Sequence, residues 1–491
     1  MRAKLFSSML VFVAILAGCS SAIVVDPTPE PVLDVSYAFP DCDTMENDGS
    51  RQCATDRTAP TEALPAVVTG SSLSACMVQD QSKEGTDPNG MRVGFPRSET
   101  NWGNGTKKVL IAAFDWPDLS DTADPVELLT KDAEYFKNYV NLYTRGNVSI
   151  EYEIYPNRIK LLESYKNFAQ SEATANTSQW GDGNVRAIDY FYEQFIQAAD
   201  DELTFDYDLY FLIPPRFNEV FSEFNLWPPH SKTYETNEQP IVRAFTPGGD
   251  YHFRTENKLG FFWSHEIMHY FRLPDLYWHD QNSVKRTENT FSGAFANFDL
   301  MDGQYVASLN SYLMWLADWT LPGEQVCLSE ENYQDSSYEL SAISVNDSSL
   351  KSVMLRLSET ELLVVESRRA TEFDNVGRRA KEGVMVFHVD TTVGNGEGAL
   401  TIIAPPGRKL ISDILPGGAN TTMLDAFLYE GNRIEIAGYL IEVNKSKLQS
   451  DIVSISKIPG WQPGTATDYV CISRDNRQLD EEGRVDCPIT F

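Results

Sequence analysis

Two histidines and a glutamate within five residues, His265-Glu266-Ile267-Met268-His269, have the types and spacing of a metal-dependent hydrolase. Residues four apart lie on one face of an α-helix, so His265 and His269 can present two imidazoles to one ion. Glu266 follows the first histidine directly and can act as general base towards a water that the metal activates. The chain has only six histidines, which makes this spacing uncommon by chance. The segment therefore predicts a zinc site.

The residues around this motif predict a buried helix that ends soon after it. Apolar side chains surround the motif from Leu259 to Phe271, and a helix that is apolar nearly all round lies inside a fold. Pro274 disfavours the helical conformation at Leu273, so we expect the helix to stop near Arg272. A core helix with two hydrogen-bonded histidines is the alternative interpretation.

Three acids or histidines are candidates for a third ligand, because catalytic zinc takes three protein ligands and leaves a position for water. Asp275 lies ten residues after His265, and a sharp exit from the helix can bring its carboxylate back to the metal. Glu288 lies nineteen residues after His269, a spacing that thermolysin-like enzymes use, although the residues around it are typical of a loop. His279 is the third candidate.

The run from His265 to Tyr277 (HEIMHYFRLPDLY) resembles the active-site segment of the immune inhibitor A family of secreted bacterial metallopeptidases, H-E-x-x-H-x-x-G-L-P-D-L-Y. Residues 297–303 (NFDLMDG) resemble the W-D-L-M segment of that family, and residues 309–325 resemble its next helix. Arg272 departs from the pattern, because the family has glycine there, the residue suited to a left-handed turn.

This resemblance implies a metzincin-like zinc endopeptidase that cleaves extracellular or envelope proteins. Asp275 is then the third ligand, and Met301 forms a hydrophobic floor under the metal. A metal-activated water attacks the peptide bond, and Glu266 takes its proton. Tyr305 is a candidate for supporting the oxyanion, with an ordinary packed tyrosine as the alternative.

Two other functions are compatible with the same residues. A protease-like domain that has lost activity would make the chain a surface binding lipoprotein, and Arg272 is the feature that favours this alternative. The retention of the motif residues together with Asp275 and Met301 argues against it. A hydrolase of another bond, such as a cell-wall amide, would use the same metal site.

The amino terminus predicts a bacterial lipoprotein. Residues 16–19 (LAGC) resemble a lipobox after a charged start and an apolar run, so we expect Cys19 to carry lipid. Ser20, by similarity to Gram-negative lipoproteins, indicates the outer membrane, facing the periplasm or the cell surface. Residues 20–40 are rich in proline and acid and predict an extended tether.

The formal net charge of −31 excludes nucleic acid as a natural partner, because phosphates would be repelled. The expected partners are a protein or peptide substrate and the membrane. Acid-rich loops can also bind calcium. Asp115, Asp118 and Asp121 are the candidates, with ordinary solvated side chains as the alternative.

Six cysteines besides Cys19 predict disulfides in an exported chain, with free cysteines as the alternative. Proximity in the sequence favours two of the pairs, and the third would tie the amino-terminal segment to the end of the catalytic region. The pairs are Cys42–Cys53, Cys471–Cys487 and Cys76–Cys327.

Alternating elements predict an α/β catalytic domain before residue 330. The expected elements are a strand at 109–114, a helix at 126–143, a strand at 147–161, a helix at 185–199 and a strand at 207–214. Strand-like runs separated by turns then predict an all-β sandwich. These runs are 352–357, 362–366, 383–389, 433–436, 438–443 and 451–455. The predicted parts are a signal peptide (1–19), a tether (20–40), a pro- or cap segment (41–100), the catalytic domain (101–330) and the sandwich (331–491).

Overall fold

The computed structural model combines α-helices with several β-sheets and is mostly β. The chain divides into two compact units, Met1–Met45 and Glu46–Phe491, and every described residue lies in the second. The structure describes residues 73–78, 85–86, 92–93, 103–167, 182–216, 234–241, 244–246, 258–278, 295, 298–302, 307–369, 373, 382–406, 410–414, 420–424, 426–464 and 469–471.

A five-stranded sheet forms the first part, and all of its strand pairs are parallel. Its main path runs β4-β3-β6-β7, and β5 pairs with β3. The strands are β3 (Gly105–Asp115), β4 (Val148–Ile154), β5 (Ile159–Lys160), β6 (Leu209–Ile213) and β7 (Ala244–Phe245). The single strand predicted over 147–161 is therefore two strands, because the chain turns between β4 and β5.

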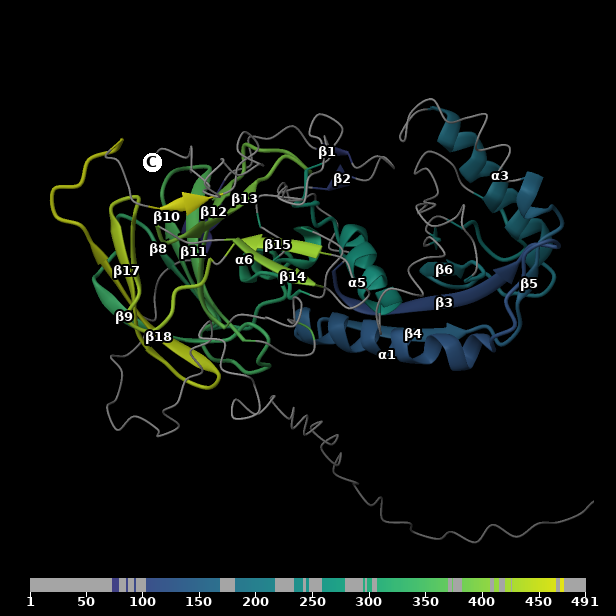
Figure 1. Ribbon diagram of the computed structural model, residues 1–491, viewed down its shortest axis with the longest axis horizontal. Helices are drawn as coiled ribbons and strands as arrows, with labels where there is room; N and C mark the ends of the chain where they lie inside the picture. The colour runs from purple at the N-terminus through teal and green to yellow at the C-terminus, as the bar shows by residue number, and fades with distance from the viewer. Residues whose placement is uncertain are drawn as a thin grey trace, which may run out of the picture. The chain divides into compact units, whose positions relative to one another are not determined.

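Helices cover both faces of this sheet, and strand β3 shows why. Alternate side chains of a strand point to opposite faces. Val109 and Ile111 pack with helix α1 (Pro125–Tyr143) and with the motif helix α5 (Lys258–Tyr270). Leu110 and Phe114 pack on the other side with helix α3 (Asp182–Ala199). Figure 1 shows α1 running alongside β3 and β4.

Helices α1 and α5 cross in close contact at Gly260 of α5 and Asp132 of α1. A Cβ atom added to Gly260 would lie 2.4 Å from the carbonyl oxygen of Asp132, so only glycine fits at this position of α5. The Asp132 carboxylate accepts a hydrogen bond of 2.8 Å from the Gly260 N–H. An acid at a helix amino terminus also interacts favourably with the helix dipole. Asp132 therefore fixes the start of the motif helix.

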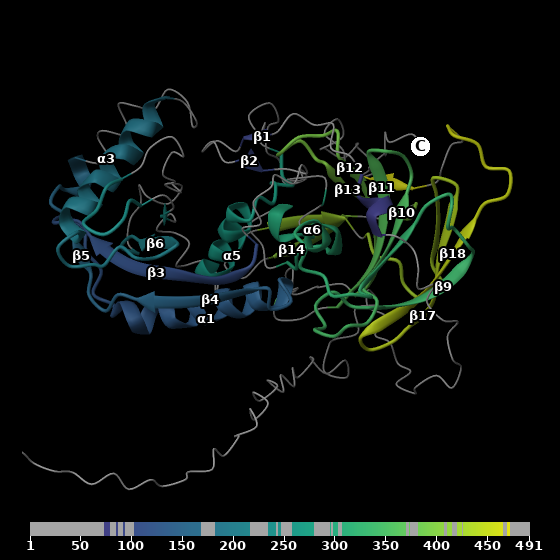
Figure 2. The same cartoon turned by 180° about the vertical axis from the view of Figure 1, so that it is seen from behind.

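The second part contains a six-stranded sheet, β19-β13-β12-β11-β10-β8, and a four-stranded sheet, β16-β17-β18-β9. Figure 2 shows both from behind. The six-stranded sheet comprises β8 (Gln325–Leu328), β10 (Ser352–Arg356), β11 (Glu361–Arg368), β12 (Gly383–Asp390), β13 (Leu400–Ala404) and β19 (Val470–Cys471). The four-stranded sheet comprises β9 (Ser336–Ser341), β16 (Arg433–Ile436), β17 (Tyr439–Ser446) and β18 (Ser450–Lys457). A separate hairpin joins β14 (Leu410–Ile414) to β15 (Asn420–Leu424).

The six-stranded sheet is buried on both faces. On β11, Leu363 and Val365 pack into the core shared with the four-stranded sheet, whereas Leu362 and Val364 pack into the core that contains α1 and α5. The part with the histidine motif and the β-rich part therefore share one hydrophobic core. Strand β8, which precedes residue 330, already belongs to the six-stranded sheet.

A disulfide and a buried ion pair also join β8 and the residue before it to earlier segments of the chain. Cys76 and Cys327 are joined by a disulfide, which confirms the predicted pair and ties the segment 73–78 to β8. Arg145, after α1, forms a fully buried ion pair of 2.8 Å with Glu324 and also donates to the carbonyl of Ile343. Removing one partner of such a pair is costly, because the other charge is then buried alone.

Each of the other two predicted disulfides includes at least one cysteine outside the described residues. Cys42, Cys53 and Cys487 lie outside them, and Cys471 is disulfide-bonded. Among the residues that the structure describes, no helix has the length and apolar character needed to cross a membrane.

Burial raises the pKa of Asp132 from 3.8 to about 6, against the opposing effect of hydrogen bonds from Gly260 and Leu259. Because the folded-state pKa is raised, the folded protein binds more protons than the unfolded chain between about pH 4 and 6, so stability falls as pH rises through this window. We predict that the Asp132→Asn variant lacks this dependence. The free energy of unfolding of the wild type, minus that of the variant, is the quantity to follow. This difference should fall by about 2 kcal/mol between about pH 4.5 and 7.5. Urea denaturation in chelator at both pH values measures it, and a constant difference would contradict the prediction.

Candidate metal centre

Helix α5 carries the motif and ends two residues earlier than the sequence predicts, at Tyr270. The Leu273 N–H donates to the carbonyl of Met268, and the Arg272 N–H donates to the carbonyl of His269. This pair of bonds is the Schellman motif, in which the residue after the cap adopts a left-handed conformation. Arg272 occupies that position with φ 73°. Arginine thus takes the conformation for which glycine is suited, and the chain turns sharply after the helix.

Three side chains from the helix and its exit converge on one point. His265 Nε2 and His269 Nε2 lie 3.2 Å apart, and Asp275 Oδ1 lies 3.4 Å from the first and 3.1 Å from the second. Zinc binds nitrogen and oxygen at about 2.0–2.1 Å, so tetrahedral ligands lie roughly 3.3 Å from one another. The three measured separations fit such an ion. Glu288 and His279, the alternative third ligands, lie outside the described residues.

Hydrogen bonds to the backbone fix the orientation of both imidazoles. His265 Nδ1 lies 2.8 Å from the carbonyl oxygen of Leu300, and His269 Nδ1 lies 2.9 Å from that of Leu273. A carbonyl oxygen can only accept, so each Nδ1 donates and each neutral ring has its lone pair on Nε2. Such bonds are the usual support of metal-binding histidines. Two Nε2 lone pairs and a carboxylate oxygen therefore face one another, an arrangement that a cation stabilises.

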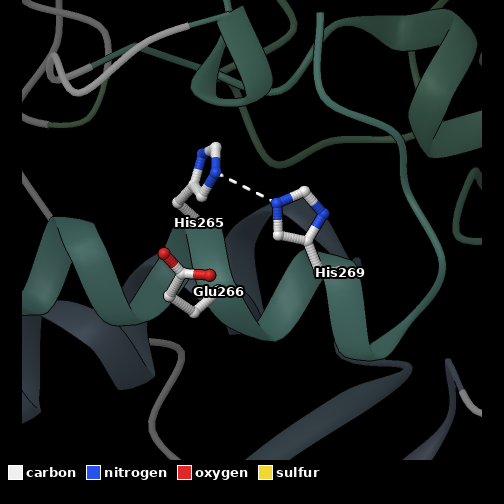
Figure 3. A group of neighbouring side chains, drawn as sticks. All are labelled: His265, Glu266 and His269. Atoms are coloured by element: carbon white, nitrogen blue, oxygen red, sulfur yellow. Dashed lines mark hydrogen bonds between the residues drawn. The ribbon is translucent and has the colours of Figure 1, made fainter. Parts of the chain in front are cut away.

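Glu266 lies beside the two histidines, as Figure 3 shows. His265, Glu266 and His269 form a group whose potential ligand atoms all lie within 4.8 Å of one another. Asp275 Oδ1 lies 3.4 Å from His265 Nε2 and 3.1 Å from His269 Nε2, which makes Asp275 a candidate for the third ligand. Glu266 is 2 % exposed, and this burial next to the ligands suits a residue that exchanges protons with a confined water.

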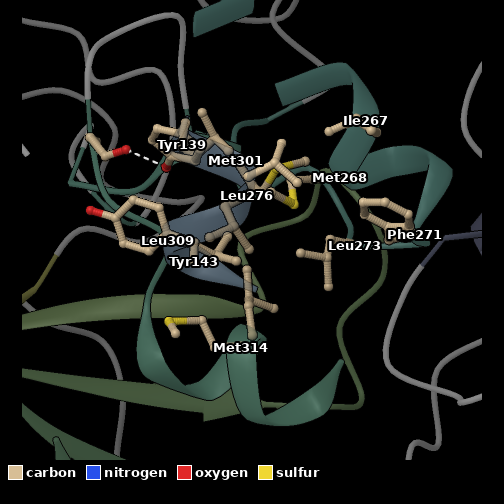
Figure 4. Packing of buried hydrophobic residues seen from close by; sticks show 14 of the residues in the cluster. Tyr139, Tyr143, Ile267, Met268, Phe271, Leu273, Leu276, Met301, Leu309 and Met314 are labelled. Carbon is tan, nitrogen blue, oxygen red and sulfur yellow. Dashed lines mark hydrogen bonds between the residues drawn. The ribbon is translucent and has the colours of Figure 1, made fainter. Parts of the chain in front are cut away.

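A short turn of 3-10 helix, η5 (Leu300–Asp302), connects the two ligand segments. The carbonyl of Leu300 accepts from His265, and the carbonyl of Met301 accepts a 2.8 Å bond from the N–H of Leu276, next to Asp275. Met301 is fully buried in the core drawn in Figure 4. Met301, the residue predicted to form a methionine turn, thus lies next to the two carbonyls that hold the candidate ligand segments.

Buried polar groups brace this turn. The Asp299 carboxylate accepts bonds of 2.8 Å from Met301 N–H and 2.7 Å from Asn310 N–H. Burial raises the pKa of Asp299 to about 6, and these bonds oppose the rise. Arg368 of β11 donates a 2.9 Å bond to the carbonyl of Phe298 and also bonds Ser308. Arg368 is in turn paired with Glu366.

The β-rich part also contacts Asp275, the candidate third ligand, directly. Asp275 N–H donates a 2.7 Å bond to Asn395 Oδ1, and Gly396 N–H donates a 3.1 Å bond to the carbonyl of Asp275. Asn395 and Gly396 lie in the loop between β12 and β13. Their sequence is typical of a turn, so nothing in it indicated a role at the metal centre.

Comparison of the chain with protein-family models and with curated proteins finds no match. The assignment of the site therefore depends on its own residues and geometry.

The calcium candidates are paired with protein cations or backbone groups. Asp115 bonds Arg158 and Lys160, and Asp121 accepts bonds of 2.6 and 2.8 Å from Arg216. Hydrogen bonds from Arg216 lower the pKa of Asp121 despite the opposing effect of burial, which is the largest single influence. Asp118 accepts from the N–H groups of residues 165 and 166. These contacts lend the calcium expectation no support. Tyr305 and Cys19 lie outside the described residues.

The left-handed conformation of Arg272 gives a testable consequence. A residue with a Cβ atom is less stable there than glycine by about 1 kcal/mol. We predict that Arg272→Gly is more stable than Arg272→Ala by this amount, because both variants lack the guanidinium and only one retains Cβ. Chemical denaturation measures the difference. Equal stability of the two variants would contradict the prediction, because it would show that the turn relaxes. We also expect both variants to have the same zinc content.

Proposed function

We propose that this chain is a zinc-dependent endopeptidase. One observation carries the proposal: His265 Nε2, His269 Nε2 and Asp275 Oδ1 lie 3.1–3.4 Å from one another. Three ligands from two histidines and a carboxylate leave a position for water, as catalytic zinc sites do. The buried glutamate directly after the first histidine supplies the general base that hydrolysis requires.

Zinc at this site would lower the pKa of a bound water and polarise the carbonyl of the scissile bond. Glu266 would take the proton of the attacking water and deliver it to the leaving amine. His265 and His269 would be held in the required tautomer by the carbonyls of Leu300 and Leu273. Met301 would form the hydrophobic floor of the site, on the side that faces the core.

The wider proposal follows the resemblance to the immune inhibitor A family. We infer a metzincin-like catalytic domain followed by a β-sandwich, anchored to the bacterial envelope by lipid at Cys19. The parallel sheet with helices on both faces, and the two packed sheets after it, support this arrangement. The substrates would be proteins of the envelope or the surroundings.

The alternative of an inactive binding lipoprotein depends on a distortion at Arg272. Arg272 instead completes the helix end through its backbone, with φ 73°. Asp275, three residues later, still lies within 3.4 Å of both imidazoles. This geometry supports a competent site in preference to a degenerate one.

Zinc content tests the ligand set. We expect Asp275→Ala and His265→Ala to lose stoichiometric zinc, because two ligands hold the ion much less tightly than three. Two control variants should keep it: Glu288→Ala, and His388→Ala, which changes a buried histidine paired with Glu361. Metal analysis after purification without chelator gives the result. Loss of zinc in Glu288→Ala but not in Asp275→Ala would indicate the thermolysin-like arrangement.

Hydrolysis tests the role of Glu266. Glutamine matches glutamate in shape but cannot accept a proton at neutral pH, so Glu266→Gln should bind zinc and lose activity by roughly 10²–10⁴-fold. Casein digestion by wild type and variant, each with and without chelator, measures this loss. Equal activity that resists chelator would contradict the proposed mechanism.

A further inference from the structure

The loop between β12 and β13, residues 391–399, reaches the exit of the motif helix and holds both backbone polar groups of Asp275. Asn395 Oδ1 accepts the 2.7 Å bond from the Asp275 N–H, across 120 positions of the sequence. Gly396 N–H donates the 3.1 Å bond to the Asp275 carbonyl. The next N–H, that of Leu276, donates to Met301. Three consecutive polar groups of the ligand segment are therefore held by distant residues.

These bonds determine where the carboxylate of Asp275 can go. With its N–H and carbonyl both held, the backbone of Asp275 has little rotational freedom, and only the two side-chain torsions remain. Asp275 Oδ1 lies 3.1 Å from His269 Nε2 and 3.4 Å from His265 Nε2. Supporting groups of this kind orient metal ligands without touching the metal.

The loop is itself well fixed, so it can act as a support. At its base, Asp390 N–H donates 2.9 Å to the carbonyl of Ala399, and Thr391 N–H donates 3.0 Å to that of Thr360. Gly396 has φ 69° and Gly398 has φ 84°, conformations that favour glycine. The base of the loop and its two glycines are thus held by contacts and conformations that do not involve the side chain of Asp275.

Asn395 holds Asp275 through its side-chain oxygen. A backbone N–H can only donate, which assigns Oδ1 to the side of Asp275. Asn395 Nδ2 is buried and forms no hydrogen bond with the residues that the structure describes. Replacing the amide nitrogen therefore removes no bond known from this part of the chain.

We propose that Asn395 is a positioning residue of the metal centre, which acts on zinc affinity through the backbone of Asp275. This inference rests on the proposed function, because it assumes that Asp275 is a zinc ligand. Loss of a supporting partner typically weakens metal binding by roughly 10- to 100-fold. The β-rich part would then be a component of the metal centre.

Zinc affinity of the full chain, measured by competition with a chromogenic chelator, tests the proposal. Asn395→Ala should weaken zinc binding by roughly 10- to 100-fold, and Asn395→Asp, which keeps the accepting oxygen and adds a negative charge that attracts a cation, should not show this loss. Asn332→Ala is the matched control, because Asn332 Oδ1 also accepts a 2.7 Å bond from a backbone N–H, that of Ser329, in a turn after β8. Its zinc affinity should be unchanged. If Asn395→Ala does not fold, Asn395→Gln, which displaces the oxygen, should show the loss.

A double variant tests whether Asn395 acts on zinc binding through Asp275. If Asn395 acts through Asp275, adding Asn395→Ala to Asp275→Ala should weaken zinc binding no further. Additive losses would overturn the proposal, as would unchanged affinity in Asn395→Ala or an equal loss in Asn332→Ala, while the zinc site itself would stand. Failure of the wild-type chain to bind zinc at all would instead overturn the proposed function and this inference with it.

Discussion

Three electron-rich atoms, two imidazole nitrogens and a carboxylate oxygen, face one another in the interior of this protein. His265, His269 and Asp275 are each less than a tenth exposed, so with no proton or cation between them water does little to weaken the repulsion between their lone pairs. A bound cation would remove that repulsion, but the protein must bring the atoms together first. Much of the surrounding structure can be understood as the support that this arrangement requires: carbonyls hold the rings, and distant residues hold the ligand backbone.

That support comes from both parts of the protein. Helix α1 fixes the start of the motif helix through Asp132, and Gly260 allows the close crossing. Strand β11 of the six-stranded sheet contributes Arg368, which bonds the carbonyl of Phe298, and the loop between β12 and β13 contributes Asn395 at Asp275. Because this sheet is buried on both faces, it lies between the core that contains the motif helix and the core that it shares with the four-stranded sheet.

The sequence predicted most reliably what is encoded within a few residues. The two histidines share one helical face, so their spacing sufficed to bring the imidazoles together, and the sharp helix exit brings Asp275 beside them. Helix α1 and most strands were also found, since their apolar residues recur at regular intervals. Asn395 could not be found, because its role depends on a contact 120 positions away. The division at residue 330 did not anticipate the shared core, since burial of the six-stranded sheet on both faces depends on tertiary packing.

The bond between Cys76 and Cys327 joins residues 251 positions apart and encloses the motif helix and the whole parallel sheet. A single peptide-bond cut anywhere inside this ring would leave both pieces covalently joined. A nicked molecule would migrate as one species under non-reducing conditions and separate only after reduction. Whatever precedes Cys76 would likewise stay attached to such a nicked protein, so one cut inside the ring would not release the motif helix from the amino-terminal segment.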